Sequence, residues 1–202
     1  MIRIIVSLAI LLGGTVLVQA QTDCTRAMLQ TAVDSYIAAQ TAGDPSRMSL
    51  DPKARFLENM SEISRDKGLW NKALPIAFHR SIYDTGRCMT FSEAIVTEGG
   101  HPYVVGTRLK VKDAKVTEID SLVTDDGDWL FNAQDYLKYS KAEDWPVLHI
   151  DDRVSRQDLV DAANQYLDFV FMDKGIRPPW GTPCARLEGG AYTNAKNENK
   201  DT

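Results

Sequence analysis

Two segments of the chain repeat apolar residues at the spacing of an amphipathic helix. In residues 24–42 the apolar positions recur at intervals of three and four, and Gly43-Asp44-Pro45 ends the pattern. The second segment begins at Ser155, which suits an N-cap, and runs to Lys174, just before Gly175. Each segment is predicted to be a helix that buries one face.

Between residues 74 and 123 the pattern changes to strict alternation. Apolar and polar residues alternate through 88–96 and again through 103–111, as they do in strands that bury one face. Residues 112–115 predict a tight turn before a return strand at 116–123, and 99–102 joins the first two strands. These elements predict an α+β fold in which a helix packs on a curved, cone-like antiparallel sheet.

The two helical segments resemble each other, and so do the stretches that follow them, 54–58 and 185–188. We therefore expect an α+β domain at 21–140, a second helix with a partial repeat at 141–193, and a disordered polar tail at 194–202. Chance similarity between two amphipathic helices is the alternative to a true duplication. The matched apolar positions are Leu29, Ala32, Tyr36 and Ile37 in the first helix and Leu159, Ala162, Tyr166 and Leu167 in the second.

The amino terminus has the order of a secretory signal peptide at residues 1–20. Arg3 gives a positive start, an apolar stretch follows over 4–18, and Val18-Gln19-Ala20 places small or β-branched residues at the cleavage positions. A membrane anchor is the alternative, but roughly 15 apolar residues interrupted by two glycines are short for a span that needs about 20. We expect cleavage before Gln21 and secretion of the mature chain.

Three cysteines remain after this cleavage, Cys24, Cys88 and Cys184, in a compartment where disulfides persist. Three thiols allow three single pairings and leave one thiol over. The cysteines lack CxxC spacing and the three histidines are scattered, so no metal site is predicted. Asn59-Met60-Ser61 is an N-glycosylation sequon, and its use would require a surface position.

Charge and motifs exclude several classes of function. The chain has 23 Lys and Arg against 28 Asp and Glu, a net charge of −5 at pH 7, without a basic tract. Nucleic-acid binding is therefore not expected, because affinity for the phosphate backbone comes from clustered Lys and Arg. The sequence has no GxSxG, GxGxxG or phosphate-binding glycine-rich loop, so the esterase, dehydrogenase and nucleotide-hydrolase classes lack their signatures and no cofactor is predicted.

Aromatic residues gather in and around the segment between the two predicted helices. We interpret them as core packing or contact between the two units, rather than as a ligand cage. They are Trp129, Phe131, Tyr136, Tyr139, Trp145 and Trp180.

Glu93 is the first candidate for acid–base chemistry. Strand alternation places it on the same face as Met89, Phe91 and Ile95. A carboxyl group on an apolar face is more readily protonated than one in water, which suits a general acid or base near neutral pH. The structural alternative is an outward face, or an ion pair with an arginine such as Arg108 across the sheet.

His79 and Asp120 are the other two candidates. His79 lies in a predicted strand, and histidine is the usual proton-transfer residue near pH 7. Asp120, on the return strand, could face Glu93 or His79 across the sheet and would then orient the imidazole. A buried structural histidine and a solvated surface carboxylate are the alternatives for these two residues.

Several segments give the chain from Cys24 to Thr193 a family resemblance. It resembles a group of small secreted fungal proteins of uncharacterised function, which are distantly similar to the SnoaL-like polyketide cyclases and to the nuclear transport factor 2-like cone fold. Members of this group usually continue past the Gly-Gly pair of the last segment with a further cysteine and more strands. The matching segments are residues 79–84, 88–93, 101–107, 127–133 and 180–190.

This resemblance implies a pocket between a curved sheet and its helices that takes a small apolar or polycyclic metabolite. It implies either a cofactor-independent isomerase, cyclase or dehydratase of fungal secondary metabolism, with His79, Glu93 and Asp120 as proton-transfer groups, or a non-catalytic extracellular protein that binds a ligand or a host partner. The fold does not decide between the two. Pairing of two copies through the sheet is compatible with either.

Overall fold

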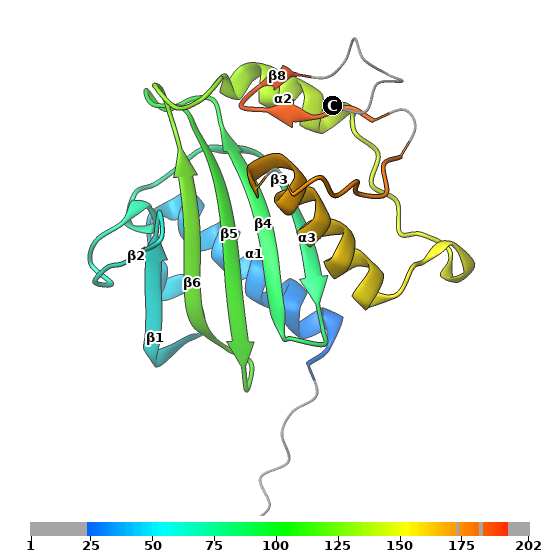
Figure 1. Cartoon of the computed structure of the whole chain (residues 1–202). Helices are drawn as coiled ribbons and strands as arrows, with labels where there is room; N and C mark the ends of the chain where they lie inside the picture. Colours follow the sequence, from blue (N-terminus) through cyan, green and yellow to red (C-terminus); the bar gives the residue numbers. More distant parts are fainter. Residues whose placement is uncertain (1–23, 173, 182–183, 194–202) are drawn as a thin grey trace, which may run out of the picture.

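The computed structural model describes residues 24–172, 174–181 and 184–193, so the predicted signal peptide and the predicted tail lie outside it (Figure 1). None of the helices in these described segments has the length and apolar character of a membrane span. The helices are α1 (Arg26–Ala42), α2 (Ala133–Ala142) and α3 (Arg156–Met172), with 3-10 turns η1 (Pro45–Arg47), η2 (Leu69–Asn71) and η3 (Ile150–Asp152). The strands are β1 (Leu50–Glu58), β2 (Ser61–Glu62), β3 (Ile76–Asp84), β4 (Met89–Val96), β5 (Tyr103–Lys112), β6 (Lys115–Thr124), β7 (Leu187–Glu188) and β8 (Ala191–Tyr192).

A six-stranded sheet forms the centre of the fold, in the order β2-β1-β6-β5-β4-β3. Strands β3 to β6 form the predicted antiparallel meander, and the turn between β5 and β6 places Asp113 and Ala114 at positive φ, as a tight hairpin requires. One pairing departs from the antiparallel pattern, since β1 joins β6 in parallel. The predicted α+β class, with helices packed on a curved open sheet, is confirmed (Figure 1).

Helix α1 covers one face of the sheet and supplies most of the core. Thr25 caps its first turn by accepting the Met28 N–H, and the helix buries Leu29, Val33 and Tyr36. The Tyr36 hydroxyl lies 2.7 Å from the Thr107 hydroxyl in the middle of β5. Each large apolar side chain buried in this way contributes about 1.5–3 kcal/mol to stability. This face, called here the helix face of the sheet, is therefore closed to solvent where α1 covers it.

A disulfide joins Cys24, just before α1, to Cys88, just before β4. Of the three pairings that the sequence allowed, the structure therefore selects this one and leaves Cys184 as a free thiol. The bond ties the start of the helix to the hairpin between β3 and β4. It restricts the unfolded chain, which is the usual origin of the stability that a disulfide adds.

The other face of the sheet, called here the open face, is covered only in part. Helix α2 and the β7–β8 hairpin lie across one end of it, and α3 runs in front of β3 and β4 (Figure 1). Helix α3 has no buried residue, although an ion pair between Arg156 and Asp84 joins its first turn to the end of β3. The open face is therefore the less covered side of the sheet.

The units α1–β1–β2 and α3–β7–β8 share local geometry. In both, a hydroxyl side chain before the helix accepts an N–H three residues later, Thr25 from Met28 and Ser155 from Asp158. In both, a hairpin with a two-residue turn follows the helix, pairing Leu57 with Glu62 and Leu187 with Tyr192. The second unit thus consists of a helix and a hairpin of two short strands.

Candidate functional site

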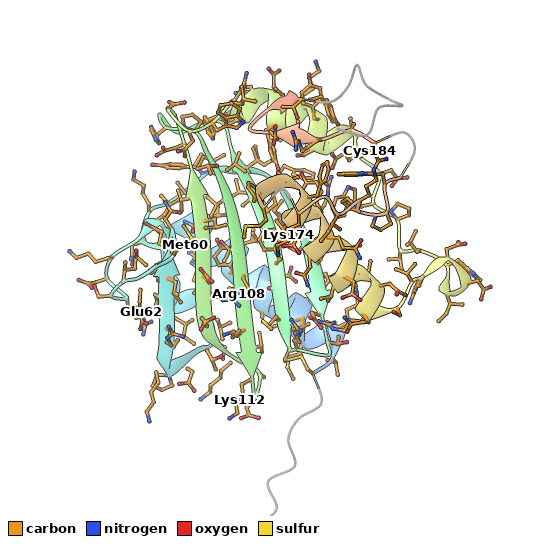
Figure 2. All side chains as sticks on the ribbon, in the orientation of Figure 1. Met60, Glu62, Arg108, Lys112, Lys174 and Cys184 are labelled. Carbon is orange, nitrogen blue, oxygen red and sulfur yellow. A yellow bond between two sulfur atoms is a disulfide. The ribbon has the colours of Figure 1, made fainter. Side chains whose placement is uncertain are left out.

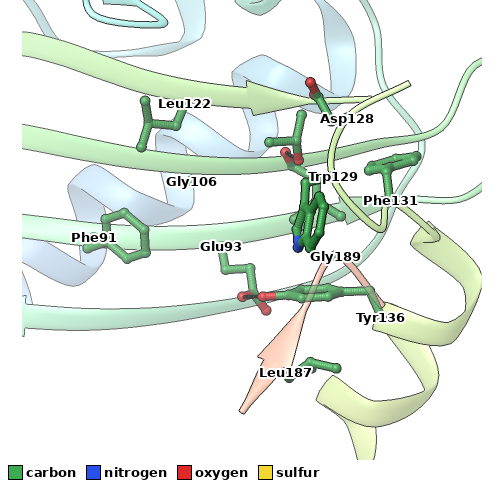
Figure 3. A pocket seen from close by; sticks show the side chains of 12 residues that line it. Phe91, Glu93, Gly106, Leu122, Asp128, Trp129, Phe131, Tyr136, Leu187 and Gly189 are labelled. Carbon is green, nitrogen blue, oxygen red and sulfur yellow. Dashed lines mark hydrogen bonds between the residues drawn. The ribbon is translucent and has the colours of Figure 1, made fainter. Parts of the chain in front are cut away.

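A cavity of about 460 Å³ lies on the open face at the end that α2 and the β7–β8 hairpin cover (Figure 3). Its walls come from three parts of the chain that are far apart in sequence. The apolar side chains around it are Phe91, Val104 and Leu122 from the sheet, Trp129 and Phe131 from the loop before α2, and Leu187 from β7.

Two glycines make room for this cavity. Gly106 pairs with Glu93 across β4 and β5, and a Cβ atom at this position would lie 2.9 Å from the Phe91 ring. Gly189 has φ +59°, and a Cβ there would lie 2.4 Å from the Trp129 carbonyl oxygen. Glycine therefore lets the aromatic ring and the hairpin approach closely, which is the usual meaning of glycine inside a strand or a tight turn.

Glu93 supplies the carboxyl group of the cavity. The Tyr136 hydroxyl donates a hydrogen bond of 2.7 Å to Glu93 Oε2 (Figure 3). The Ser140 hydroxyl lies 3.4 Å from Glu93 Oε1. Tyr136 and Ser140 are four residues apart on α2, so both side chains leave the same face of the helix. Burial, reinforced by the Glu93 carboxylate, raises the pKa of Tyr136 well above its usual range. Tyr136 therefore remains a hydrogen-bond donor across the physiological pH range.

A second cavity of about 360 Å³ lies on the other side of the Glu93–Tyr136 pair. Arg80, opposite Glu93 on β3, borders it and is only 18% exposed. Its guanidinium donates to Glu143 Oε2 at 2.7 Å and to the Ser140 carbonyl oxygen, and lies 4.6 Å from the Trp145 ring centroid. These contacts hold the carboxyl end of α2 against β3. Arg80 thus positions the helix that carries Tyr136.

The structure places the three predicted site residues in different surroundings. Glu93 lines both cavities with Phe91, on the face that the alternation predicted, and it bonds to Tyr136 rather than to Arg108. His79 pairs with Ala94 on β3 and is exposed on the helix face of the sheet. Because neighbouring strand residues point to opposite faces, His79 lies on the far side of the sheet from Glu93. The two are not brought together.

Asp120 shares the open face with Glu93 but does not reach it. Arg108 donates to Asp120 Oδ2 at 2.7 Å and to Glu118, which is nearly buried and also pairs with Arg55 and Lys110. Figure 2 shows Arg108 on the strands of the open face. The expectation that Asp120 faces Glu93 or His79 was therefore wrong. The Asp120 carboxylate instead pairs with Arg108, its neighbour on β5.

Helix α2 and its two polar side chains, Tyr136 and Ser140, were not predicted from the sequence. The surrounding aromatic residues were interpreted as core packing or contact between the two units; Trp129 is 76% exposed and lines the cavity together with Phe131 and Tyr136. A local signal was present: Asn132 accepts the Asp135 N–H as an N-cap. The spacing of Tyr136 and Ser140 then gives one polar stripe on a short helix, although no local pattern shows that this stripe meets Glu93.

The described residues contain no group of three or more His, Cys, Asp or Glu side chains arranged to hold a metal ion. The cavity presents a carboxyl group with a phenol donor, Glu93 with Tyr136, set in an apolar and aromatic wall. It can accept a proton from a bound molecule, or a hydrogen bond from it, and can offer a phenolic hydrogen bond in return.

Comparison with known proteins gives one family match, over residues 152–202, to a domain of unknown function (DUF8021). The matched segment contains α3, β7 and β8 and extends to the last residue of the sequence. It leaves out β3 to β6 and therefore the sheet that carries Glu93. No curated protein matches the chain.

Two solved structures are similar in part. AclR from Streptomyces galilaeus shares 14% identity at a TM-score of 0.38, over 60% of this chain and 91% of AclR. An NTF-2 like protein of unknown function from Burkholderia xenovorans LB400 shares 14% identity at a TM-score of 0.35, over 60% of this chain and 97% of that protein.

Proposed function

We propose that this protein binds a small, largely apolar molecule on the open face of its sheet, and that Glu93 and Tyr136 act on that molecule as a proton acceptor and a hydrogen-bond donor. One observation carries the proposal. The Glu93 carboxyl group and the Tyr136 hydroxyl, 2.7 Å apart, lie between two cavities whose walls are mainly apolar and aromatic. Polar groups placed in a concave apolar site are the usual arrangement of a small-molecule site.

The chemistry that this pair supports is transfer of a proton without a cofactor. Glu93 would take a proton from a carbon or a hydroxyl of the substrate and return it at a second atom. Once Glu93 is protonated, the single proton of the Tyr136 hydroxyl would turn from Glu93 to the substrate oxygen on which charge develops. Isomerisation, cyclisation and dehydration all consist of such steps. This is the reaction class that the resemblance to SnoaL-like proteins implied.

A non-catalytic binding protein is the second candidate. It is favoured by a run of exposed apolar side chains between α2 and α3, where Trp145, Val147 and Ile150 are each more than half exposed. Exposed apolar surface of this extent is typical of a contact with a partner. In that case the cavity would hold a ligand without turning it over.

The test begins with native mass spectrometry of the protein from the cells that make it, which would detect and identify a bound molecule. Glu93→Gln keeps the shape of the side chain and removes its basicity. We expect it to lower turnover of that molecule by roughly 10²- to 10⁴-fold while the fold is retained. Glu98→Gln, the same change at an exposed position after β4, is the matched control and should leave turnover unchanged.

Measurements of binding and turnover on the same proteins distinguish a binding protein from an enzyme. If Glu93→Gln binds the molecule and the unaltered protein does not convert it, the non-catalytic candidate is correct. If Phe91→Ala and Glu93→Gln both bind it as tightly as the unaltered protein does, the molecule sits elsewhere and the proposed site is wrong.

A further inference from the structure

The hairpin between β1 and β2 presents an asparagine at its tip. Glu58 pairs with Ser61, which leaves Asn59 and Met60 as a two-residue turn with φ +48° and +65°. Turns of this kind require positive φ at both positions, and asparagine tolerates that conformation better than most residues. Asn59 is exposed and Met60 is 87% exposed (Figure 2). Asn59 is also the first residue of the Asn59-Met60-Ser61 sequon.

The side-chain amide of Asn59 is held in one orientation. Its Oδ1 accepts the backbone N–H of Val123 on β6 at 2.8 Å. Its Nδ2 donates to no partner among the described residues, whereas Asn71 Nδ2 donates to the carbonyl oxygens of Arg65 and Lys67. The nitrogen that would carry a sugar is therefore the free atom of this side chain, and the oxygen keeps its hydrogen bond after modification.

A second feature points to the compartment in which such a modification takes place. The Cys24–Cys88 disulfide is a bond of oxidising compartments such as the lumen of the secretory pathway, where N-glycosylation of Asn-x-Ser sequons also occurs. We propose that Asn59 is an N-linked glycosylation site. The ligand of this site is thus a covalently attached oligosaccharide, added in the compartment that forms the disulfide. In this transfer Asn59 Nδ2 forms a bond to the anomeric carbon of the sugar, the bond from that carbon to the pyrophosphate of an activated oligosaccharide donor breaks, the pyrophosphate leaves, and the amide loses one proton.

The position of Asn59 determines which part of the surface the glycan would cover. Strand β2 is one edge of the six-stranded sheet, and an exposed edge is a template for pairing with another chain. A glycan on the β1–β2 turn would cover Met60 and crowd this edge. The cavity around Glu93 borders β4, β5 and β6 and would stay accessible.

The test uses the full chain, including residues 1–20, isolated from the culture medium or secretory compartments of the eukaryotic cells that express it. Peptide mapping under non-reducing conditions reports the Cys24–Cys88 bond and the occupancy of Asn59 in the same molecule. We expect a disulfide-bonded product that carries a glycan on Asn59, and that peptide N-glycosidase releases this glycan. Asn59→Gln and Ser61→Ala should both abolish the modification, whereas Ser61→Thr should retain it.

Two outcomes would overturn the proposal. A disulfide-bonded chain with unmodified Asn59 would show that the sequon is passed over in the right compartment. A chain with neither the disulfide nor the glycan would show that the protein does not pass through the oxidising compartment on which the proposal depends. Neither outcome bears on ligand binding at Glu93, which is measured separately.

Discussion

Helices α1 and α3 have the same length, 17 residues, and both begin after a hydroxyl side chain that caps the first turn. Their surroundings differ. Leu29 in α1 is completely buried against the sheet, while its counterpart Leu159 in α3 is 60% exposed. The same local pattern thus produces a core helix in one unit and a surface helix in the other, because only α1 packs its apolar side chains into the core beneath the sheet.

The hairpins of the two units differ in the same way. Strand β1 extends the six-stranded sheet by pairing with β6, so its hairpin is part of the main fold. Strands β7 and β8 form a sheet of their own that packs on the loop before α2, where the Asn132 N–H donates to the Gly189 carbonyl oxygen. One hairpin builds the scaffold, and the other closes one side of the cavity.

Removal of the disulfide should cause the largest loss of stability, because the bond anchors the first unit and has no counterpart among the described residues of the second. It closes a loop with a sequence separation of 64, which corresponds to about 4 kcal/mol of unfolding free energy. We expect the Cys24→Ser, Cys88→Ser double variant to lose about this much in urea unfolding. Cys184→Ser, in the second unit, should lose less than about 0.5 kcal/mol, and an equal loss in both variants would contradict the difference between the units.

Truncation of the matched leucines should have the next largest effect. Leu29→Ala leaves a cavity in the core and should cost about 3 kcal/mol. Leu159→Ala removes an exposed side chain and should cost less than about 0.5 kcal/mol. Chemical denaturation of both variants measures the two values. A large cost for Leu159→Ala would mean that α3 is covered by a partner under the conditions of the experiment.

The buried Tyr36 on α1 makes the unfolding free energy depend on pH. Burial raises the pKa of Tyr36 from 10 to about 12. The folded state therefore holds its proton more tightly than the unfolded state does, so the stabilisation is complete below pH 10 and is lost as the pH rises to 12. The loss amounts to about 2–3 kcal/mol.

Unfolding free energies measured across this pH window test the assignment. Tyr36→Phe has no phenol to titrate, so its stability should fall less steeply above pH 10 than that of the unaltered protein. Tyr166→Phe, the matched change on α3, should keep the full slope. Identical slopes for all three proteins would show that Tyr36 is not the group responsible.

The ion pair between Arg156 and Asp84 should have the smallest effect. Arg156 donates to Asp84 and lowers the pKa of that carboxyl. The stabilisation is therefore present above the ordinary pKa of about 4 and is lost as the pH falls. The arginine is half exposed, so Arg156→Ala should cost at most about 1 kcal/mol.

Hydrogen exchange gives a more specific measure of this pair. Arg156→Ala should lower amide protection in α3 while protection in α1 is unchanged. Asn164→Ala, an exposed change on the same helix, serves as the control and should alter neither. Loss of protection in both helices would mean that the two units unfold as one.

Local sequence patterns account for most of the secondary structure. The apolar spacing of 24–42, with Gly43 in the left-handed conformation at its end, predicts α1. The alternation in 88–96 predicts both the strand and the face on which Glu93 lies. These features depend on neighbours within a few residues, so the sequence contains them directly.

The candidate site depends on contacts between distant parts of the chain. Tyr136 reaches Glu93 across 43 positions, and Arg80 binds Glu143 across 63. Asp120 illustrates the same limit, since its place on a strand was predicted but its partner Arg108 was not. Strand register and helix docking select such partners, and both result from packing of the whole sheet rather than from local propensity.

The amino-acid pattern therefore specified the helices, the meander and the alternation that sends Phe91 and Glu93 to one face, since each follows from backbone geometry over a few residues. Folding in three dimensions selected Cys88 as the partner of Cys24, inserted β1 beside β6 in parallel, and placed α2 over Glu93. Each of these depends on which surfaces remain to be buried once the sheet has formed. That is why two similar helices in one chain, α1 and α3, end in different environments.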